Sequence, residues 1–323
     1  MILVTGGAGY IGSHYVLYER ERGTEVVVLD NMVYGHPEAV LDAKLVEGDV
    51  SDRSVLELIF TENNVDAVVH FAAFASVGES VVHPELYYNN NVRATLNLLD
   101  TMRDFGVRYF VFSSSCATYG NPEYVPMDES HPQNPINPYG ESKYICEKMM
   151  SAYSHAHGLR FASLRYFNAA GADPQGRIGE SHDPESHIIP IILQVAGGKQ
   201  DKVSILGDDY DTPDGTCIRD YIHILDLAQA HSLALDRLRS GADSDYFNLG
   251  TEAGYSVREV IDLCGKVTGC EIKTEIAERR PGDPPRLVAS AAKAKSVLGW
   301  TPNYSDLEET IKTAWNWEQD RRF

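Results

Sequence analysis

A glycine-rich turn near the N-terminus constrains the fold more than any other segment of this chain. Residues 2–12 read ILVTGGAGYIG, so Gly6, Gly9 and Gly12 follow a short apolar run and precede a segment of helical length. The first glycine permits a tight turn, the second lets the backbone approach a pyrophosphate, and the third allows the helix to pack closely on the strand. A helix that begins here offers free N–H groups to phosphate oxygens. The segment therefore predicts a strand, turn and helix that bind a dinucleotide.

The first half of the chain alternates between short apolar runs and helix-length segments. Runs of strand length lie at 2–4, 26–29, 44–50, 66–72, 109–115 and 161–166, and helix-length segments lie at 10–22, 53–63, 84–106 and 139–157. Such alternation is typical of βαβ units around a parallel sheet that is covered on both faces. We therefore expect a Rossmann-type α/β fold with a doubly wound parallel sheet.

The alternation loosens after residue 176, where loops rich in Pro and Gly separate the elements. Helices are expected at 188–197, 225–239 and 256–269, and strands at 203–206 and 246–249. We therefore divide the chain into a dinucleotide-binding domain at 1–176 and a smaller mixed α/β C-terminal substrate domain at 177–323. Some segments of the second part are expected to return to the first.

Charge and composition exclude several classes of partner. The net charge is −19, whereas nucleic acids and anionic membranes attract proteins with a positive field. The apolar run IIPIILQVAGG is too short to cross a bilayer, and the N-terminus lacks a signal-peptide pattern. Five cysteines without metal-binding spacing suit a reducing compartment. We expect a cytoplasmic protein that binds a small molecule and has no metal, nucleic-acid or membrane partner.

An aspartate ends the second expected strand. Asp30 follows Gly12 by eighteen positions, and a carboxylate there accepts hydrogen bonds from both ribose hydroxyls of an adenosine. It would repel a 2′-phosphate, and the following NMVYGHPEA contains no Lys or Arg. The segment therefore favours NAD over NADP. The alternative is an aspartate that only caps a turn at the end of the strand.

The stretch NPYGESKYICE places Tyr139 and Lys143 one helical turn apart. Asn137 and Pro138 suit the N-cap and first position of a helix, so Tyr139 would lie in its first turn. A tyrosine has a pKa of about 10, but a nearby ammonium, a helix N-terminus and a cationic nicotinamide ring each favour the phenolate. Such a tyrosine can take a proton from a substrate hydroxyl while a hydride leaves the same carbon for a bound nicotinamide. Ser115, at the end of the fifth expected strand, would orient that hydroxyl. The alternative is that Tyr139 and Lys143 are only an exposed pair on the surface of the helix.

The order and spacing of these motifs resemble the extended short-chain dehydrogenase/reductase superfamily, and within it the UDP-glucose 4-epimerase family. TGGAGYIG, SSSCATYG and YGESK carry the first resemblance, and RYFNAAGA, TPDGTCIRDYIHILDLAQAH and RRPGDPP carry the second. The resemblance implies interconversion of UDP-glucose and UDP-galactose through transient oxidation at C4 by tightly bound NAD, with a 4-keto intermediate and hydride return to its opposite face. A 4-epimerase for a UDP-N-acetylhexosamine or for UDP-xylose/UDP-arabinose, and a non-enzymatic NAD-binding sensor, are the alternatives.

The resemblance also implies the residues of each site and a quaternary structure. The implied catalytic residues are Ser115, Tyr139 and Lys143. The implied cofactor residues are Gly6, Gly9, Tyr10, Ile11, Gly12, Asp30, Asn31, Asp49, Val50, Phe71, Ala72, Ala73 and Asn91, with Tyr139 and Lys143. The implied substrate residues are Ser115, Tyr139, Asn168, His187, Ile188, Leu206, Arg219, Arg280 and Asp283. The arginines would clamp the diphosphate, since planar guanidinium groups pair with phosphate oxygens. Relatives are commonly homodimers that pack helices near 84–106 and 139–157 into a four-helix interface.

Several positions depart from the pattern of related enzymes. Ala75 stands where well-known members have a lysine at the ribose, and Ser76 is a candidate substitute. Dehydratase relatives have an Asp-Glu pair where positions 116–117 read Cys-Ala here, which cannot move protons in that way. His187 replaces an asparagine. Leu287 is intermediate between the large and small residues that set sugar preference, so the preferred sugar stays open.

Overall fold

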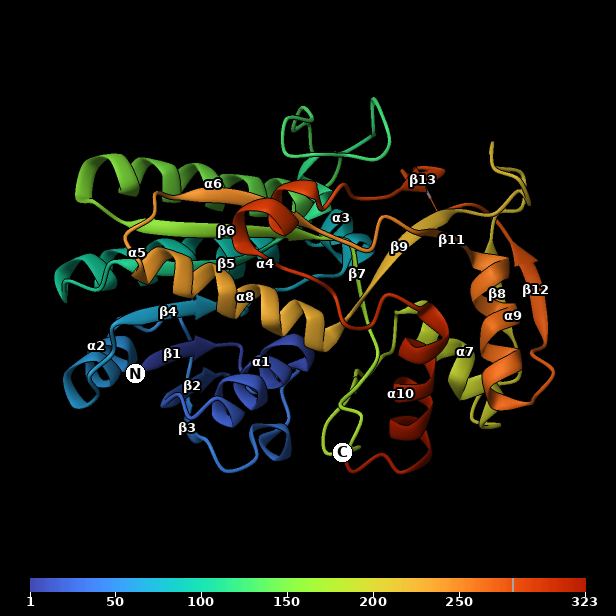
Figure 1. Cartoon of the computed structure of the whole chain (residues 1–323), viewed down its shortest axis with the longest axis horizontal. Coiled ribbons are helices and arrows are strands. Elements are labelled where there is room, and N and C mark those ends of the chain that lie inside the picture. Colours follow the sequence, from blue (N-terminus) through green and yellow to red (C-terminus); the bar gives the residue numbers. More distant parts are fainter. Residues whose placement is uncertain (281) are drawn as a thin grey trace.

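A seven-stranded sheet organises the larger lobe of the protein, for which the computed structural model describes residues 1–280 and 282–323 (Figure 1). The strands run in the order β10-β6-β5-β4-β1-β2-β3, and all neighbours are parallel. They are β1 (Ile2–Thr5), β2 (Val26–Asp30), β3 (Lys44–Glu47), β4 (Ala67–His70), β5 (Tyr109–Ser115), β6 (Arg160–Tyr166) and β10 (Asp245–Leu249). The predicted doubly wound sheet is confirmed. Its order reverses between β1 and β4, the switch point at which such sheets bind ligands.

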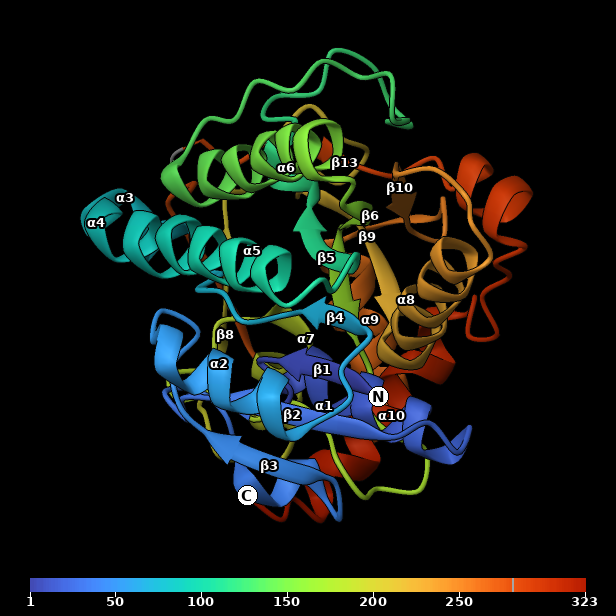
Figure 2. The ribbon, with the colours of Figure 1, turned by 90° about the vertical axis from the view of Figure 1, so that its left-hand side faces the viewer.

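Helices cover both faces of this sheet, which explains why its strands are apolar almost throughout. α1 (Tyr10–Glu21) and α8 (Ile224–Arg239) lie on one face (Figure 2). α2 (Arg53–Glu62), α5 (Ala94–Asp104) and α6 (Pro138–His157) lie on the other. Successive residues of β1 alternate between the two cores: Ile2 and Val4 pack under α1 and α8, and Leu3 packs under the other layer.

The helix expected at 84–106 is interrupted. Residues there form α4 (Pro84–Tyr87), a π-helical segment (Tyr88–Arg93) and then α5, and the unexpected α3 (Val77–Val82) precedes them. The wide π turn carries Asn91, one of the expected site residues. Such turns occur frequently at functional sites.

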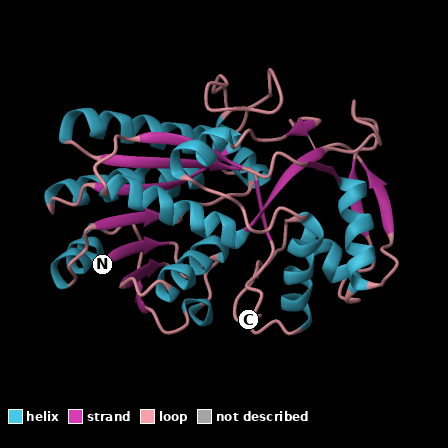
Figure 3. Cartoon of the chain, in the orientation of Figure 1, coloured by secondary structure: helices cyan, strands magenta, loops and turns pink. Residues whose placement is uncertain are grey.

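The smaller lobe combines short strands and helices (Figure 3). One sheet contains β7 (Asn168–Ala170), β9 (Ile218–His223), β11 (Gly254–Ser256) and β13 (Arg286–Leu287), and another pairs β8 (Val203–Leu206) with β12 (Thr274–Ala277). The helices are α7 (Ile188–Ala196), α9 (Val257–Thr268) and α10 (Leu307–Gln319). Short helical turns occupy Pro37–Val40, Cys116–Thr118 and Ala294–Leu298. Of the three lobe helices, only α10 was not expected.

The chain crosses between the lobes more than once. β10 pairs with β6 at the edge of the large sheet, although it lies far beyond residue 176. β7 precedes that residue but pairs with β9 of the smaller lobe. The domain boundary at residue 176 therefore stays a prediction, and segments on each side of it contribute to the other lobe. Within residues 1–280 and 282–323, no helix combines the length and apolar character that a membrane span requires.

Candidate active site

Two positions in the glycine turn must be glycine because a Cβ there would collide with the chain itself, and the third position has room for a Cβ. Gly6 has φ 72°, and a Cβ there would lie 2.5 Å from the Ala72 nitrogen. A Cβ on Gly12 would lie 2.1 Å from the Gly6 oxygen, whereas one on Gly9 would meet that oxygen only at 3.5 Å. Gly9 is the N-cap of α1 and has no capping side chain, and the Ser13 N–H is the donor to its carbonyl at 2.9 Å. The N–H groups of the first turn are therefore available to an anionic ligand.

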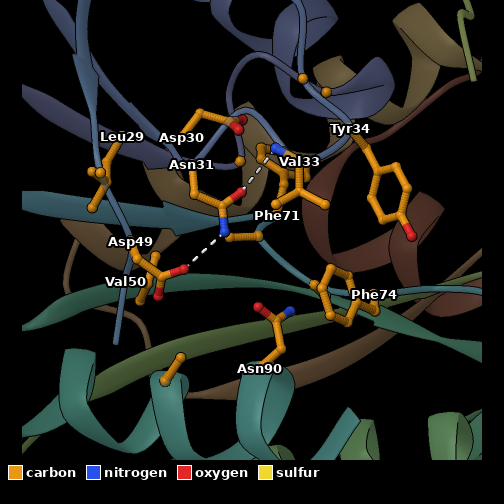
Figure 4. Close-up of a pocket in the computed structure, with 17 residues that line it drawn as sticks. Leu29, Asp30, Asn31, Val33, Tyr34, Asp49, Val50, Phe71, Phe74 and Asn90 are labelled. Carbon is orange, nitrogen blue, oxygen red and sulfur yellow. Dashed lines mark hydrogen bonds between the residues drawn. The ribbon is translucent and has the colours of Figure 1, made fainter. Parts of the chain in front are cut away.

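A pocket lies beside this turn, at the carboxyl ends of β1, β2 and β4 (Figure 4). Nine expected cofactor residues line it: Gly6, Gly9, Asp30, Asn31, Asp49, Val50, Phe71, Ala72 and Ala73. Eight lining residues were not expected: Leu29, Val33, Tyr34, Gly35, Gly48, Phe74, Asn90 and Ala94. Val33, Tyr34 and Gly35 lie three to five positions after Asp30, so their nearness to Asp30 in the sequence was the available signal. Among the described lining residues only the two aspartates are charged, which suits an adenosine without a 2′-phosphate.

Asp30 ties the glycine turn to the loop after β2. It is 7% exposed, and its two carboxylate oxygens accept hydrogen bonds from the Ala8 N–H at 2.9 Å and the Met32 N–H at 3.0 Å. A Cβ on Gly35 would lie 2.8 Å from one of these oxygens. The turn-capping interaction considered as the alternative is therefore present. Each oxygen also retains a lone pair for a ribose hydroxyl, because a carboxylate offers about four acceptor sites.

Asn31 and Asp49 form the neighbouring wall of the pocket. The Asn31 Nδ2 donates to Asp49 at 2.8 Å, and the Asn31 Oδ1 accepts from the Val33 N–H at 3.2 Å (Figure 4). Burial would raise the pKa of Asp49, but hydrogen bonds from Ser51 and Asn31 outweigh it and lower the pKa. Asp49 is therefore an ionised acceptor beside Val50, as binding an adenine amino group requires.

Six expected cofactor residues do not line this pocket: Tyr10, Ile11, Gly12 and Asn91, together with Tyr139 and Lys143 at the start of α6. Tyr10, Ile11 and Gly12 lie in the first turn of α1, and the Tyr10 hydroxyl donates to the Gly171 oxygen at 2.6 Å. Asn91 is buried and bonds both the N–H and the carbonyl of Phe74, at 2.9 and 3.0 Å. Its Nδ2 also donates to a serine on α6 at 3.0 Å. Asn91 therefore fixes the pocket wall against α6.

The start of α6 brings the three expected catalytic residues together. Asn137 caps the helix by accepting from the Gly140 N–H at 2.8 Å, as expected. A Cβ on Gly140 would lie 2.3 Å from the backbone oxygen two residues after Ser115, so the helix closely approaches the end of β5. Lys143 is buried and donates to the Ser113 carbonyl on β5 at 2.7 Å. Tyr139 and Ser115 lie at the same edge, and the neighbouring Ser115 side chain counteracts part of the effect of burial on the pKa of Tyr139.

Burial dominates the protonation of these groups. It raises the pKa of Tyr139 to about 12, and the neighbouring Ser115 only partly offsets this. Burial also lowers the pKa of Lys143 to about 8. In the protein without a cofactor, the neighbouring Lys143 therefore does not offset the effect of burial on the pKa of Tyr139, and the expected combined action of the ammonium, the helix N-terminus and the nicotinamide ring stays a prediction. The physical reason is that a buried phenolate loses its hydration, while the lysine is directed to the Ser113 carbonyl.

Two further positions near the site, Cys116 and Ala75, lack the chemistry that a nucleophile or a ribose-binding lysine would supply. Burial raises the pKa of the Cys116 thiol to about 12, so a thiolate is absent at neutral pH. Ala75 is exposed, and the neighbouring Ser76 caps α3 by accepting from the Glu79 N–H at 3.3 Å. Ser76 is not among the residues that line the pocket. Among the described residues that line the pocket, none is a cation that could replace the usual lysine.

Three of the nine expected substrate residues, Asn168, Arg219 and Asp283, gather around β9. The Arg219 guanidinium donates to Asp283 at 2.5 Å, and the Arg219 side chain is 12% exposed. Asn168 donates to the backbone oxygen of Asp220 at 2.8 Å, and Leu287 lies opposite Arg219 in the register of β13 and β9. These contacts place a cation, a carboxylate and an amide beside the carboxyl ends of β5 and β6.

The remaining substrate residues lie on neighbouring segments. Leu206 ends β8 opposite Ala277, and the exposed Arg280 follows β12 by three positions. His187 is the N-cap residue of α7, which begins at Ile188, and its Nδ1 contacts Glu180. The described contacts do not join these residues to Arg219, so their part in one site stays a prediction.

Comparisons with known proteins agree with this arrangement. Residues 2–250 match the NAD dependent epimerase/dehydratase family. A UDP-glucose 4-epimerase of Halalkalibacterium halodurans is 55% identical, over 99% of this chain and 96% of that protein. The crystal structure of UDP-glucose 4-epimerase from Brucella ovis in complex with NAD is 49% identical, with a TM-score of 0.95 over 97% of both chains. The enzyme from Bifidobacterium longum in complex with NAD+ and UDP is 38% identical, with a TM-score of 0.94 over 99% of this chain and 98% of that chain.

Proposed function

Because the chain belongs to the NAD-dependent epimerase/dehydratase family, we propose that it is an NAD-dependent 4-epimerase that interconverts UDP-glucose and UDP-galactose. The motif-based resemblance to these enzymes is confirmed by relatives that match nearly the whole chain. The observation that carries the proposal is the meeting of Ser115, Tyr139 and Lys143 at the sheet edge that also bears the pocket.

The residues of the pocket fit the adenosine half of NAD. The first turn of α1 offers uncapped N–H groups to the pyrophosphate, and Asp30 has acceptor sites left for the ribose. Asp49 and Val50 provide an acceptor and an apolar surface for the adenine. When bound, NAD accepts a hydride from C4 of the sugar and returns it.

The chain supplies the proton chemistry and the orientation of the sugar. Tyr139 would remove the proton of the C4 hydroxyl, and Ser115 would hold that hydroxyl by a hydrogen bond. A pKa of about 8 keeps Lys143 largely protonated at neutral pH, which favours the phenolate during the reaction. Arg219 and Arg280 would hold the diphosphate and Asp283 the uridine ribose, so the sugar can turn while the nucleotide stays bound.

Tyr139→Phe tests the assigned base. It should lower kcat by about 10²- to 10⁴-fold, the usual contribution of a general base, while the NAD that co-purifies stays near the wild-type amount. Tyr144→Phe, one turn along the same helix, is the matched control and should keep wild-type turnover of UDP-galactose. Turnover by Tyr139→Phe within about ten-fold of wild type would remove Tyr139 from the mechanism.

We also propose that the protein is a cytoplasmic homodimer. All five cysteines are free, as suits a reducing compartment. α5 and α6 lie side by side on one face of the large lobe (Figure 2), and Tyr88 and Leu96 expose 40% and 39% of their surface there. A second copy that packs the same two helices would bury these apolar side chains.

A further inference from the structure

Two glutamates and two histidines converge in the loop between β7 and α7. Glu180, His182, Glu185 and His187 alternate along GESHDPESH, and one donor atom of each lies within 4.8 Å of the donor atoms of the other three. The His182 Nδ1 lies 3.2 Å from a Glu180 oxygen and 3.7 Å from a Glu185 oxygen. The His187 Nδ1 lies 4.0 Å from the same Glu185 oxygen and also contacts Glu180. None of these interactions takes part in the proposed proton transfer.

The spacing of the donor atoms suits a tetrahedral metal ion. Zinc binds nitrogen and carboxylate oxygen at about 2.0–2.2 Å, which places the donors of a tetrahedron about 3.3–3.5 Å apart. The separations of 3.2, 3.7 and 4.0 Å lie around that value, whereas the His187 Nδ1 and the Glu180 oxygen form a short hydrogen bond and would move apart to bind an ion. Two carboxylates and two neutral imidazoles would also balance the charge of a divalent ion.

The cluster is not satisfied by hydrogen bonds alone. The His182 Nδ1 and the Glu185 Oε2 are buried, and neither has a hydrogen-bond partner among the residues that the structure describes. The His182 Nδ1 lies close to Glu180 but is not aligned for a hydrogen bond with it. Buried polar atoms without partners are costly, and in native proteins they call for an ion or a water. A metal ion at the common point of the four donors would satisfy both atoms.

The surrounding chain holds these ligands in place. The Trp317 indole of α10 donates to the Glu180 backbone oxygen at 2.8 Å, and the His36 ring bonds the Ser181 oxygen at 3.0 Å. Glu185 accepts from the N–H groups of the next two residues at 2.7 and 2.9 Å. Such outer contacts orient metal ligands and are a usual part of metal sites.

We propose that Glu180, His182, Glu185 and His187 bind one divalent transition-metal ion, with Zn²⁺ as the best match to two imidazoles and two carboxylates. The ion has a structural role: it closes the loop onto the N-cap residue of α7, His187, and fixes the ring of that histidine. No metal was expected from the sequence, and the proposal revises that expectation. It does not depend on the proposed reaction.

Zinc binding to protein first freed of metal with a chelator tests the proposal. Titration calorimetry and elemental analysis should find one Zn²⁺ per chain, and Glu185→Gln and His182→Gln should each weaken binding at least about 100-fold. His83→Gln is the matched control, because His83 lies 3.6 Å from Glu85 in an exposed pair elsewhere, and it should bind as the wild type does. Zinc should raise the Tm of the wild type and of His83→Gln only.

Several results would overturn the site. These are the absence of stoichiometric Zn²⁺ binding by the wild type, unchanged affinity in His182→Gln and Glu185→Gln, and an equal loss in His83→Gln. Glu185→Gln keeps the shape of the side chain, and its far-UV circular dichroism should match the wild type. A failure of the proposed epimerase activity would leave all these readouts unaffected.

Discussion

At the scale of single residues, a buried ion pair lies directly beneath the catalytic edge. Arg165 on β6 donates to both carboxylate oxygens of Glu147 on α6, at 2.9 and 2.6 Å, and both side chains are nearly inaccessible. Glu147 also accepts from the Ser114 hydroxyl at 2.8 Å. Ser114 precedes Ser115, and Glu147 follows Lys143 by one turn. The pair therefore holds the catalytic serine and lysine in register.

Glu147→Gln should destabilise the protein and misplace the catalytic groups. Removing one partner leaves a buried guanidinium without its countercharge, which costs about 3–5 kcal/mol. We expect that loss in the free energy of unfolding by urea, together with a fall in kcat at nearly unchanged KM. Glu57→Gln, in the exposed pair with Arg53, is the control and should change stability by no more than about 0.5 kcal/mol. A similarly small change in Glu147→Gln would show that the buried pair is dispensable.

At the scale of elements, the fold requires one glycine of the turn, Gly12, whereas we expect the cofactor to require another, Gly9. Gly12→Ala places a Cβ 2.1 Å from the Gly6 oxygen, so the helix must move and thermal stability should fall. Gly9→Ala meets that oxygen at 3.5 Å, an ordinary contact, and should leave the Tm of the cofactor-free protein near the wild-type value. Gly9→Ala should nevertheless reduce NAD retention after gel filtration, because the pyrophosphate must approach this backbone. Full NAD retention in Gly9→Ala would remove that role.

The elements that the sequence predicts well are those whose signal is local. Apart from α3 and the π-helical interruption before α5, the strands and helices of the first 166 residues follow from apolar runs. Asp30 follows from its place after the glycine turn. The sequence signal for β10 is local too, but its place in the large sheet depends on pairing with β6, about 80 residues earlier in the chain. α10 was missed although Asp306 caps it and Leu307 and Ile311 bury one face.

The site is predictable as a set of residues but less so as chemistry. The motif places Tyr139 and Lys143 correctly at the start of α6, because an N-cap and helical spacing are local properties. The pKa of Tyr139 depends instead on how completely the fold excludes water, which spacing cannot show. Tyr34 and Phe74 likewise form a pocket wall through a ring contact with centroids 5.7 Å apart, between loops from different strands.

At the scale of the whole molecule, the exposed face of α5 predicts self-association. The wild type should sediment as a dimer, and Leu96→Glu should shift it to the monomer, because a carboxylate buried in an interface is costly. Val297→Glu is the control, since Val297 is 44% exposed on a segment that packs near α8 on the other face of the sheet. A monomeric wild type, or a dimer in Leu96→Glu as tight as the wild type, would contradict this interface.

Four buried histidines also make the stability of the folded chain depend on pH. Burial lowers the pKa of His14 and His231 to about 4 and that of His70 and His223 to about 3, whereas an unfolded histidine has a pKa of about 6.5. Below pH 6.5 the unfolded chain therefore binds more protons than the folded one, and stability falls as the pH falls toward 4.

The size of this effect can be measured on the cofactor-free protein. Each of the four histidines contributes about 1.4 kcal/mol less stability at pH 5.5 than at pH 7.5, or about 5 kcal/mol together. His182 and His187 act in the opposite direction, because their contacts with Glu180 raise their pKa and they add stability as the pH falls, so the net loss should be smaller. Urea unfolding at pH 7.5, 6.5 and 5.5 measures the net loss, and His231→Gln should reduce it by about 1.4 kcal/mol, because one of the four protonation sites is gone. A free energy of unfolding that stays constant over this range would mean that these side chains are reached by water and protons in the folded state.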